Sequence, residues 1–293
     1  MNRLLIVDGH AYAYRAFHAI RELRGPEGRP TNAIFGFVKM LEKMRQALRP
    51  THLMVAWDGG LSAERLAALP DYKAQRAEMP QDLRPQFDEI EKYLAAAGIA
   101  SYCGTGVEAD DYIATLAQRA AEKSWDVVIA SSDKDFMQLV SERIGLLNPN
   151  DKTGAVWTRE QVLAKTGVEP EQVADWLALM GDAVDNIPGV PGVGPKTAAE
   201  LLKQFGSVEN LLARLDEVKS EKLRAVLRES AENVRRNQRL VRLPEVPCEF
   251  APEQLAGRPA DRSALRELFG GWGFKGMLAE LDAGLAVKQA ELI

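Results

Sequence analysis

The 293-residue sequence has few cysteines and histidines, and it lacks the long hydrophobic run of a membrane span. Its two cysteines, Cys103 and Cys248, are too few for a disulfide framework or for a zinc site of their own, and its three histidines lack the spacing of metal ligands. The apolar run 4–7 stops at Asp8 and is too short for a membrane span or a signal peptide. We therefore expect a protein of the reducing cytoplasm without membrane contact.

An excess of positive charge is also missing, because 42 acidic residues oppose 37 basic ones and the formal net charge is −5. Proteins that bind nucleic acids usually carry a basic footprint. Nine of the acids, however, fall in five short clusters, and without them the remaining charge is +4. A protein that gathers carboxylates around cations can still present a positive surface to phosphate. The charge balance therefore does not exclude DNA as a partner.

The hydrophobic pattern predicts an α/β protein. With 46% hydrophobic and 27% charged residues, the chain has the composition of a globular protein with a sizeable core. Three hydrophobic runs, 3–7, 52–57 and 127–130, lead to an acid and alternate with helical patterns such as the one over 32–48, which we expect Asn32 to cap. This alternation predicts a parallel sheet whose strands end at one edge, where such sheets bind ligands.

The rest of the chain divides by composition. Residues 59–85 contain Pro70, Pro80 and Pro85 and predict a partly helical, mobile excursion typical of a lid. From residue 158 the patterns become helical, including one long helix expected over 219–240. We expect an α/β core over 1–157, a helical region over 158–245, and a C-terminal extension over 246–293 whose role the sequence does not indicate.

The acids at the predicted strand ends and helix starts are the most informative feature. They are Asp8, Asp58, Glu108, Asp110, Asp111, Asp133, Asp135, Asp182 and Asp185. Each cluster alone could cap a helix or a turn. Gathered at one edge, carboxylates repel one another unless cations neutralise them, and Mg²⁺ takes oxygen ligands with one or two direct carboxylates per ion. The set therefore predicts a site for two divalent ions, a known device for hydrolysing phosphodiesters.

A glycine-rich segment over 189–198 follows one predicted helix and opens another. Gly192 and Gly194 allow close backbone approach, and free amides at the following helix start form an anion site suited to a DNA phosphate. A nucleotide P-loop is excluded because Pro195 separates Gly194 from Lys196 and no strand precedes the segment. An ordinary tight turn remains an alternative. Eight bases over 219–242 could likewise contact phosphate or form a solvated face.

The motifs at 7–9, 57–58, 106–111, 132–135 and 179–198 resemble those of the 5′ nuclease domain of bacterial DNA polymerase I, a relative of the flap endonucleases. The resemblance runs from residue 3 to about residue 245. It implies a PIN-like parallel-sheet nuclease core with a helical arch, followed by a helix-hairpin-helix region. It also implies a monomeric 5′ to 3′ exonuclease and flap endonuclease of replication and repair. Such an enzyme cuts flapped, nicked or 5′-overhang duplex DNA with two Mg²⁺ or Mn²⁺ ions, and K⁺ is expected at the helix-hairpin-helix.

The resemblance also implies roles for individual residues. Lys73 and Arg76 would clamp the scissile phosphate, with Tyr72 beside them in the arch, and Arg15 would lie near the substrate phosphate. The first ion would be surrounded by Asp8, Asp58, Glu108, Asp110 and Asp133, the second by Asp135, Asp182 and Asp185, with Asp111 outside both. Duplex DNA would be gripped by Gly192, Gly194, Lys196 and Thr197.

One stretch departs from the family pattern. Relatives commonly carry Lys-Gly-Lys-Thr-Phe-Arg after the acid of the second strand, whereas residues 59–65 read Gly-Gly-Leu-Ser-Ala-Glu-Arg and only Arg65 keeps the charge. We expect weaker or more salt-sensitive capture of flaps than in relatives. Three other functions stay open at this point: a non-catalytic protein that binds DNA junctions, an RNA-directed nuclease of similar architecture, and a small-molecule phosphatase.

Overall fold

The computed structural model describes the chain from residue 2 to residue 290, with side chains up to residue 283. The described residues form two compact units, which are presented one at a time. The first unit contains the residues up to Trp57, 78–102 and those from Phe250 onward. The second unit contains residues 58–77 and 103–249.

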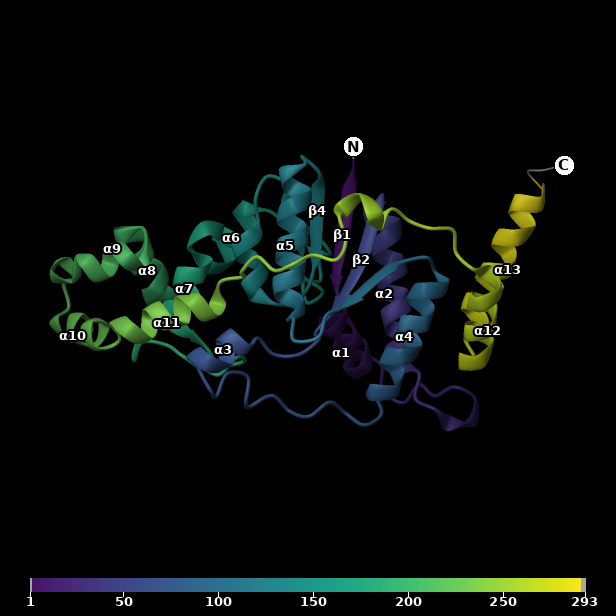
Figure 1. Cartoon of the computed structure of the whole chain (residues 1–293), viewed down its shortest axis with the longest axis horizontal. Helices are drawn as coiled ribbons and strands as arrows, with labels where there is room; N and C mark the ends of the chain where they lie inside the picture. The colour runs from purple at the N-terminus through teal and green to yellow at the C-terminus, as the bar shows by residue number, and fades with distance from the viewer. Residues whose placement is uncertain (1, 291–293) are drawn as a thin grey trace. The chain divides into compact units, whose positions relative to one another are not determined.

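The first unit is built on buried strands in the order β3-β2-β1. β1 (Arg3–Asp8) and β2 (His52–Trp57) run parallel, in a register from Leu4 opposite His52 to Asp8 opposite Ala56, and β3 (Ala100–Cys103) follows β2 in this order. Figure 1 shows α1 (Gly9–Ala19), α2 (Asn32–Leu48) and α4 (Arg84–Ala96) beside these strands. The strands predicted over 3–7 and 52–57 are confirmed, and the first one extends to its acid.

The helix predicted over 32–48 is confirmed as α2, although its cap differs from the expectation. We expected Asn32 to cap the helix, but Thr31 occupies the N-cap position. The Asn32 amide instead donates to the carbonyls of Phe17 and Ile20, both at 2.8 Å, at the end of α1. Asn32 therefore joins the start of α2 to the end of α1, and these two helices pack against each other.

The C-terminal helices of the first unit pack on α4 through aromatic side chains. α12 (Arg262–Trp272) ends at Gly273, whose positive φ of 74° breaks the helix before α13 (Lys275–Ala290). The Trp272 indole donates to Glu89 of α4 at 2.7 Å, and the rings of Phe269 and Tyr93 lie 6.2 Å apart. These contacts join α12 to α4, although more than 150 residues separate the two helices in sequence.

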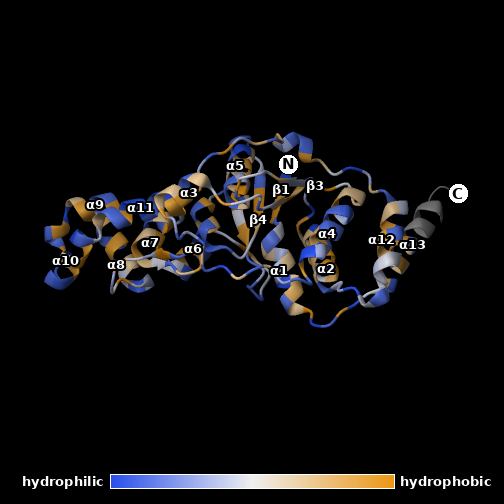
Figure 2. Ribbon diagram, turned by 60° about the horizontal axis from the view of Figure 1, so that its bottom comes forward, coloured by the Kyte–Doolittle hydropathy of each residue, from blue (hydrophilic) through white to orange (hydrophobic). Residues whose placement is uncertain are grey.

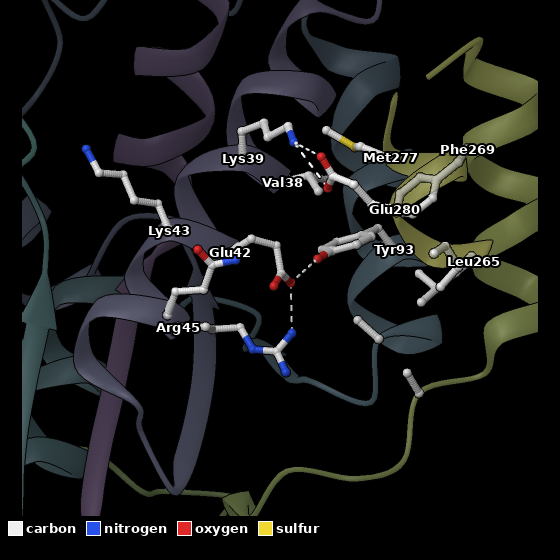
Figure 3. Close-up of a pocket in the computed structure, with 14 residues that line it drawn as sticks. Val38, Lys39, Glu42, Lys43, Arg45, Tyr93, Leu265, Phe269, Met277 and Glu280 are labelled. Carbon is white, nitrogen blue, oxygen red and sulfur yellow. Dashed lines mark hydrogen bonds and ion pairs between the residues drawn. The ribbon is translucent and has the colours of Figure 1, made fainter. Parts of the chain in front are cut away.

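A cavity of about 680 Å³ lies among α2, α4, α12 and α13 (Figure 3). Its carboxylates are paired with neighbours: Glu42 accepts from Tyr93 and from Arg45, both at 2.8 Å, and Glu280 lies 3.3 Å from Lys39. The remaining lining is largely apolar, including Leu265. Since its acids are neutralised by its own bases, the cavity lacks the arrangement expected of a catalytic metal site.

The second unit has its own strands and a layer of helices. β4 (Asp126–Ala130) pairs in parallel with β5 (Ile144–Leu147), and β6 (Val156–Trp157) is antiparallel to β5. The strand predicted over 127–130 is confirmed as β4. The excursion from residue 59 contains α3 (Ala63–Ala68), and α5 (Ala109–Glu122) packs beside β4.

The remainder of the second unit is largely helical, as predicted (Figure 1). Its helices are α6 (Arg159–Thr166), α7 (Val173–Met180), α8 (Pro195–Phe205), α9 (Val208–Ala213), α10 (Glu221–Glu229) and α11 (Ala231–Val241). The helix expected over 219–240 is two helices that meet at Ser230, so that prediction was wrong. Two short strands not expected from the sequence, β7 (Gly181–Asp182) and β8 (Ile187–Pro188), pair antiparallel.

The Asn237 amide of α11 donates to the carbonyls of Ala178 and Pro188, at 3.1 and 2.7 Å, and so ties α11 to α7 and to the hairpin formed by β7 and β8.

In the part of the chain that the structure describes, no helix combines the length and the apolar content needed to cross a membrane.

Candidate active site

Glu108 lies at the N-cap of α5 and is held by residues 59–77, the part of the arch predicted over 59–85 that belongs to the second unit; we call this part the arch from here on. One of its carboxylate oxygens accepts from the backbone amide of Ser62 at 3.0 Å and lies 3.0 Å from Arg65. The other accepts from the Tyr72 hydroxyl at 3.2 Å and pairs with the Lys73 ammonium. Burial would raise the pKa of Glu108, but Lys73 and Arg65 outweigh burial and hold it below its usual value. Glu108 therefore stays ionised although it is 1% exposed.

Lys73 is a buried cation surrounded by acids. Burial would lower the pKa of Lys73, but Asp110, Asp185 and Glu108 outweigh burial and raise it, so the ammonium stays charged. Its backbone has a positive φ of 56°, and its amide donates to the Asp185 carbonyl at 3.0 Å. The second predicted base, Arg76, forms an ion pair of 2.9 Å with the Asp185 carboxylate. Both predicted phosphate-clamping residues thus lie among the acids.

Three buried carboxylates form a group that could hold a metal ion: Asp135, Asp182 and Asp185. Asp135 lies in the 3-10 helix Lys134–Leu139 after β4, Asp182 in β7, and Asp185 in the turn between β7 and β8. One oxygen from each lies within 4.8 Å of the others. Asp182 also pairs with the Lys134 ammonium at 2.5 Å. The unexpected hairpin therefore brings two of these acids to the third.

The surroundings of Asp135 indicate whether these three acids suit a metal ion. Its Oδ1 is buried and has no hydrogen-bond partner among the described residues. Burial, and then the charge of Asp133, raise the pKa of Asp135 well above its usual value. Burial likewise raises the pKa of Asp133, whose carboxylate accepts from the Asp135 amide at 2.9 Å. An unsatisfied oxygen among carboxylates is costly without a cation and is a natural ligand for a hard divalent ion, so the residues fit Mg²⁺ or Mn²⁺.

Three further predicted site acids of the second unit lie at the start of α5. Asp58 follows β2 and accepts from the Ala109 amide at 2.9 Å, in the first turn of α5. Asp110 and Asp111 occupy the same turn. Both Asp111 oxygens are engaged by the Arg65 guanidinium, at 2.7 and 2.9 Å, and burial raises the pKa of Asp111 despite this pairing. Asp111 is therefore committed to a protein cation.

Two predicted site residues, Asp8 and Arg15, belong to the first unit. Asp8 ends β1, is 7% exposed, and caps α1 by accepting from the Ala11 amide at 3.0 Å. The next residue, Gly9, must lack a side chain, because a Cβ at this position would lie 2.4 Å from the Trp57 ring. Arg15 lies half-buried on α1. Their predicted roles at a metal ion and a phosphate stay predictions.

The glycine-rich segment forms a turn anchored at its apolar residues. The Val190 amide donates to the Leu179 carbonyl at 2.8 Å, and Val190 and Val193 are buried. Gly189 is required because a Cβ there would lie 2.2 Å from the Met180 backbone. By contrast, Gly192 and Gly194 face open space, with Lys196 exposed and Thr197 half-buried in the first turn of α8. The turn therefore presents accessible backbone next to a helix start.

Sequence reasoning missed the position of Arg65, which we expected to carry the remaining positive charge of the arch. Its side chain is 7% exposed and lies against Asp111 and Glu108. Its partners are 43 or more residues distant in sequence, so the local sequence carries no signal of this pairing. The Ser62 amide was missed for the same reason, because a backbone donor has no residue signature.

An α/β fold with buried carboxylates and cations near its strand ends, followed by helices with a glycine-rich turn, is the architecture of PIN-like nucleases. Two family profiles match the chain: the N-terminal resolvase-like domain of 5′-3′ exonucleases over residues 3–167, and their C-terminal SAM fold over residues 168–263. The chain belongs to the 5′-3′ exonuclease family.

Individual relatives agree with this assignment. A 5′-3′ exonuclease of Aquifex aeolicus is 40% identical over 284 residues, covering 96% of each chain. DNA polymerase I of Bacillus caldotenax is also 40% identical, over 286 residues, and the chain spans 32% of its length. Among solved structures, the T5 5′-exonuclease with bound zinc has a TM-score of 0.70 and 28% identity, covering 83% of this chain and 90% of that one. The fold predicted from the sequence is thus confirmed.

Proposed function

We propose that this chain is a structure-selective 5′ to 3′ exonuclease and flap endonuclease that hydrolyses phosphodiester bonds in DNA. The buried triad of Asp135, Asp182 and Asp185, with its unsatisfied Asp135 oxygen, carries the proposal. The solved T5 flap endonuclease in complex with DNA and metal ions, with a TM-score of 0.69 and 28% identity, supports it. We assign two Mg²⁺ or Mn²⁺ ions to the carboxylates, including those named from the sequence.

Two such ions, when bound, would activate the attacking water and stabilise the charge on the departing oxygen. The residues of this chain contribute the rest. Asp135, Asp182 and Asp185 supply hard oxygen ligands from a buried position. Lys73 and Arg76, which pair with Glu108 and Asp185, are cations close enough to this site to stabilise negative charge on a scissile phosphate. Tyr72 fixes Glu108 through its hydroxyl.

Duplex DNA is assigned to the helical part of the second unit. Gly192 and Gly194 leave their backbone open beside the first turn of α8, where free amides and the helix dipole favour a phosphate. Lys196 adds a positive charge at the same turn, and K⁺ is proposed there by resemblance to the helix-hairpin-helix. We further propose that the protein acts in the cytoplasm as a monomer on 5′-flap, nicked or 5′-overhang duplexes, in replication and repair. The division at residues 157 and 245 stays a prediction.

Cleavage of a labelled 5′-flap duplex in Mg²⁺ or Mn²⁺ tests the function. We expect cutting near the junction, release of 5′ fragments, and loss of at least about 100-fold in kcat for Asp135→Asn and Asp182→Asn. The matched control is Asp126→Asn, which removes a carboxylate of the same unit that pairs with Arg143 on the surface.

Three outcomes would overturn the proposal. Binding of the flap without cutting in either metal would leave a junction-binding protein. A preference for single-stranded RNA would identify an RNA nuclease. Turnover of a simple phosphate monoester at a rate comparable with DNA would identify a phosphatase, which needs neither the glycine-rich turn nor the basic helices.

A further inference from the structure

The short helix α3 in the arch is anchored by an arginine. Of its six residues, Arg65 is buried and the other five are exposed. Figure 2 shows this helix mostly in the hydrophobic colours, which matches its exposed alanines and Leu66. An apolar surface that faces solvent cannot fix a helix in place. The contacts of the Arg65 side chain must therefore carry much of that task.

All three guanidinium nitrogens of Arg65 are engaged inside the protein. Nη1 and Nη2 form a two-pronged pair with the Asp111 carboxylate at 2.9 and 2.7 Å. Nε donates to the Leu240 carbonyl at 2.9 Å, and Nη2 also donates to the Arg242 carbonyl at 3.1 Å. The planar fork of arginine allows these contacts together, which a lysine ammonium could not reproduce. The side chain thus joins α3 to the first turn of α5 and to the end of α11.

The same guanidinium reaches Glu108, since Nη1 lies 3.0 Å from its Oε1. The Ser62 amide, which begins the same helix, donates to that oxygen as well. Arg65 and the start of α3 therefore hold one of the two Glu108 carboxylate oxygens. Because the Arg65 side chain is only 7% exposed and its nitrogens are occupied, it is not available to a passing DNA strand.

We propose that Arg65 is a positioning residue that fixes the base of the arch on α5 and α11 and orients Glu108 for the reaction. It acts through Asp111 and Glu108 and does not contact the substrate. This inference rests on the proposed nuclease function for one of its readouts. The others, metal affinity and coupling to Asp111 measured by thermal unfolding, do not require cutting.

Arg65→Lys is the main variant, because it keeps the charge and loses the fork. We expect kcat on a 5′-flap duplex to fall by about 10- to 100-fold, while the DNA dissociation constant in Ca²⁺ changes by less than about 3-fold. Mn²⁺ titration should show weaker binding by about 3- to 10-fold, since Glu108 is misplaced. The matched control is Arg143→Lys, which alters an exposed arginine paired with Asp126 in the same unit and should change neither quantity.

A double-mutant cycle separates positioning from substrate contact. If Arg65 acts through Asp111, the loss of melting temperature in Arg65→Lys combined with Asp111→Asn is clearly smaller than the sum of the single losses. A fall in DNA affinity of about 10-fold or more with unchanged kcat would overturn the proposal and make Arg65 a phosphate contact. Additive effects, or unchanged kcat and unchanged Mn²⁺ affinity in Arg65→Lys, would also overturn it. If the parent protein does not cut DNA, the proposed function fails, whereas Mn²⁺ binding and the cycle still decide the role of Arg65.

Discussion

Arg76 and Asp185 form an ion pair of 2.9 Å, and the same Asp185 carboxylate belongs to the buried triad that fits a divalent ion. Lys134 pairs with Asp182 of the triad in the same way, at 2.5 Å. Cations of the chain therefore neutralise part of the charge that a metal ion would also neutralise. Protein cations and metal ions are expected to compete electrostatically for these acids.

This competition predicts that Arg76→Gln binds Mn²⁺ more tightly than the parent protein. Removing a positive charge next to Asp185 relieves its repulsion of the ion, and we expect a gain of about 3- to 10-fold in affinity by titration with Mn²⁺. Cutting should nevertheless fall, because Arg76 no longer stabilises the phosphate. Arg143→Gln serves as the control, since Arg143 pairs with Asp126 outside the triad. Weaker Mn²⁺ binding in Arg76→Gln would show that Arg76 supports the metal site instead.

Asp135→Asn is expected to stabilise the protein without metal while it abolishes cutting. The Asp135 carboxylate is buried beside Asp133, and its Oδ1 lacks a partner among the described residues, so removing the charge relieves repulsion and desolvation. We expect a gain of about 1 kcal/mol in the free energy of unfolding in EDTA, measured by thermal melting. Added Mg²⁺ should raise the melting temperature of the parent protein, because ligands that bind the folded state stabilise it, and should raise that of the variant clearly less, since the variant lacks one of the acids of the triad. A lower melting temperature of the variant in EDTA would contradict this account.

The first part of the arch, residues 59–71, predicts a weak dependence of flap binding on salt. Between residues 59 and 71 the charged side chains are Glu64, Arg65 and Asp71, and Arg65 is turned inward. Each phosphate contact to a single strand contributes about −0.7 to the slope of log affinity against log salt, so a stretch without free cations gives weak capture with a shallow slope. Of the two expectations from the sequence, weaker capture is thus favoured over greater salt sensitivity.

Leu61→Lys tests this account. Leu61 is 39% exposed, and a lysine there should tighten flap binding at low salt and steepen the slope by about 0.7. Leu163→Lys is the matched control, because Leu163 is a similarly exposed leucine on α6, at 42%. An equal change of slope in both variants would show a general charge effect and remove the arch from the explanation.

Glu89 predicts a pH-dependent stability of the first unit. Burial would raise the pKa of Glu89, but hydrogen bonds from Lys92 and Trp272 outweigh burial and lower it. A lowered pKa means that this contribution is present above the unfolded value of about 4.3 and is lost as the pH falls through the folded value. Glu89→Gln should therefore destabilise the protein by about 1 kcal/mol at pH 7 and by much less near pH 3, as measured by denaturant unfolding. Glu280→Gln, which alters an exposed pair with Lys39, should show little change at either pH.

The sequence alone determined the elements whose signals are local. The hydrophobic run at 52–57 becomes a strand with the same bounds, and the apolar period over 32–48 becomes α2. The fold class and the family also followed from the sequence, because the acids and glycines that carry the motifs stand at turns where residue type decides backbone shape. The break at Ser230 did not follow, since the charged pattern continues across it. The two-residue strands β7 and β8 are too short to give a periodic signal.

Tertiary structure alone decided which side chains meet. Asp182 and Asp185 reach Asp135 because a hairpin folds back about 50 residues further along the chain, and no local rule specifies that return. Arg65 could be counted as a free cation from the sequence, yet its partners Asp111 and Leu240 lie 46 and 175 residues away. Residue types fix what an atom can bind, whereas burial and the nearest charge, set by the folded chain, fix what it does bind.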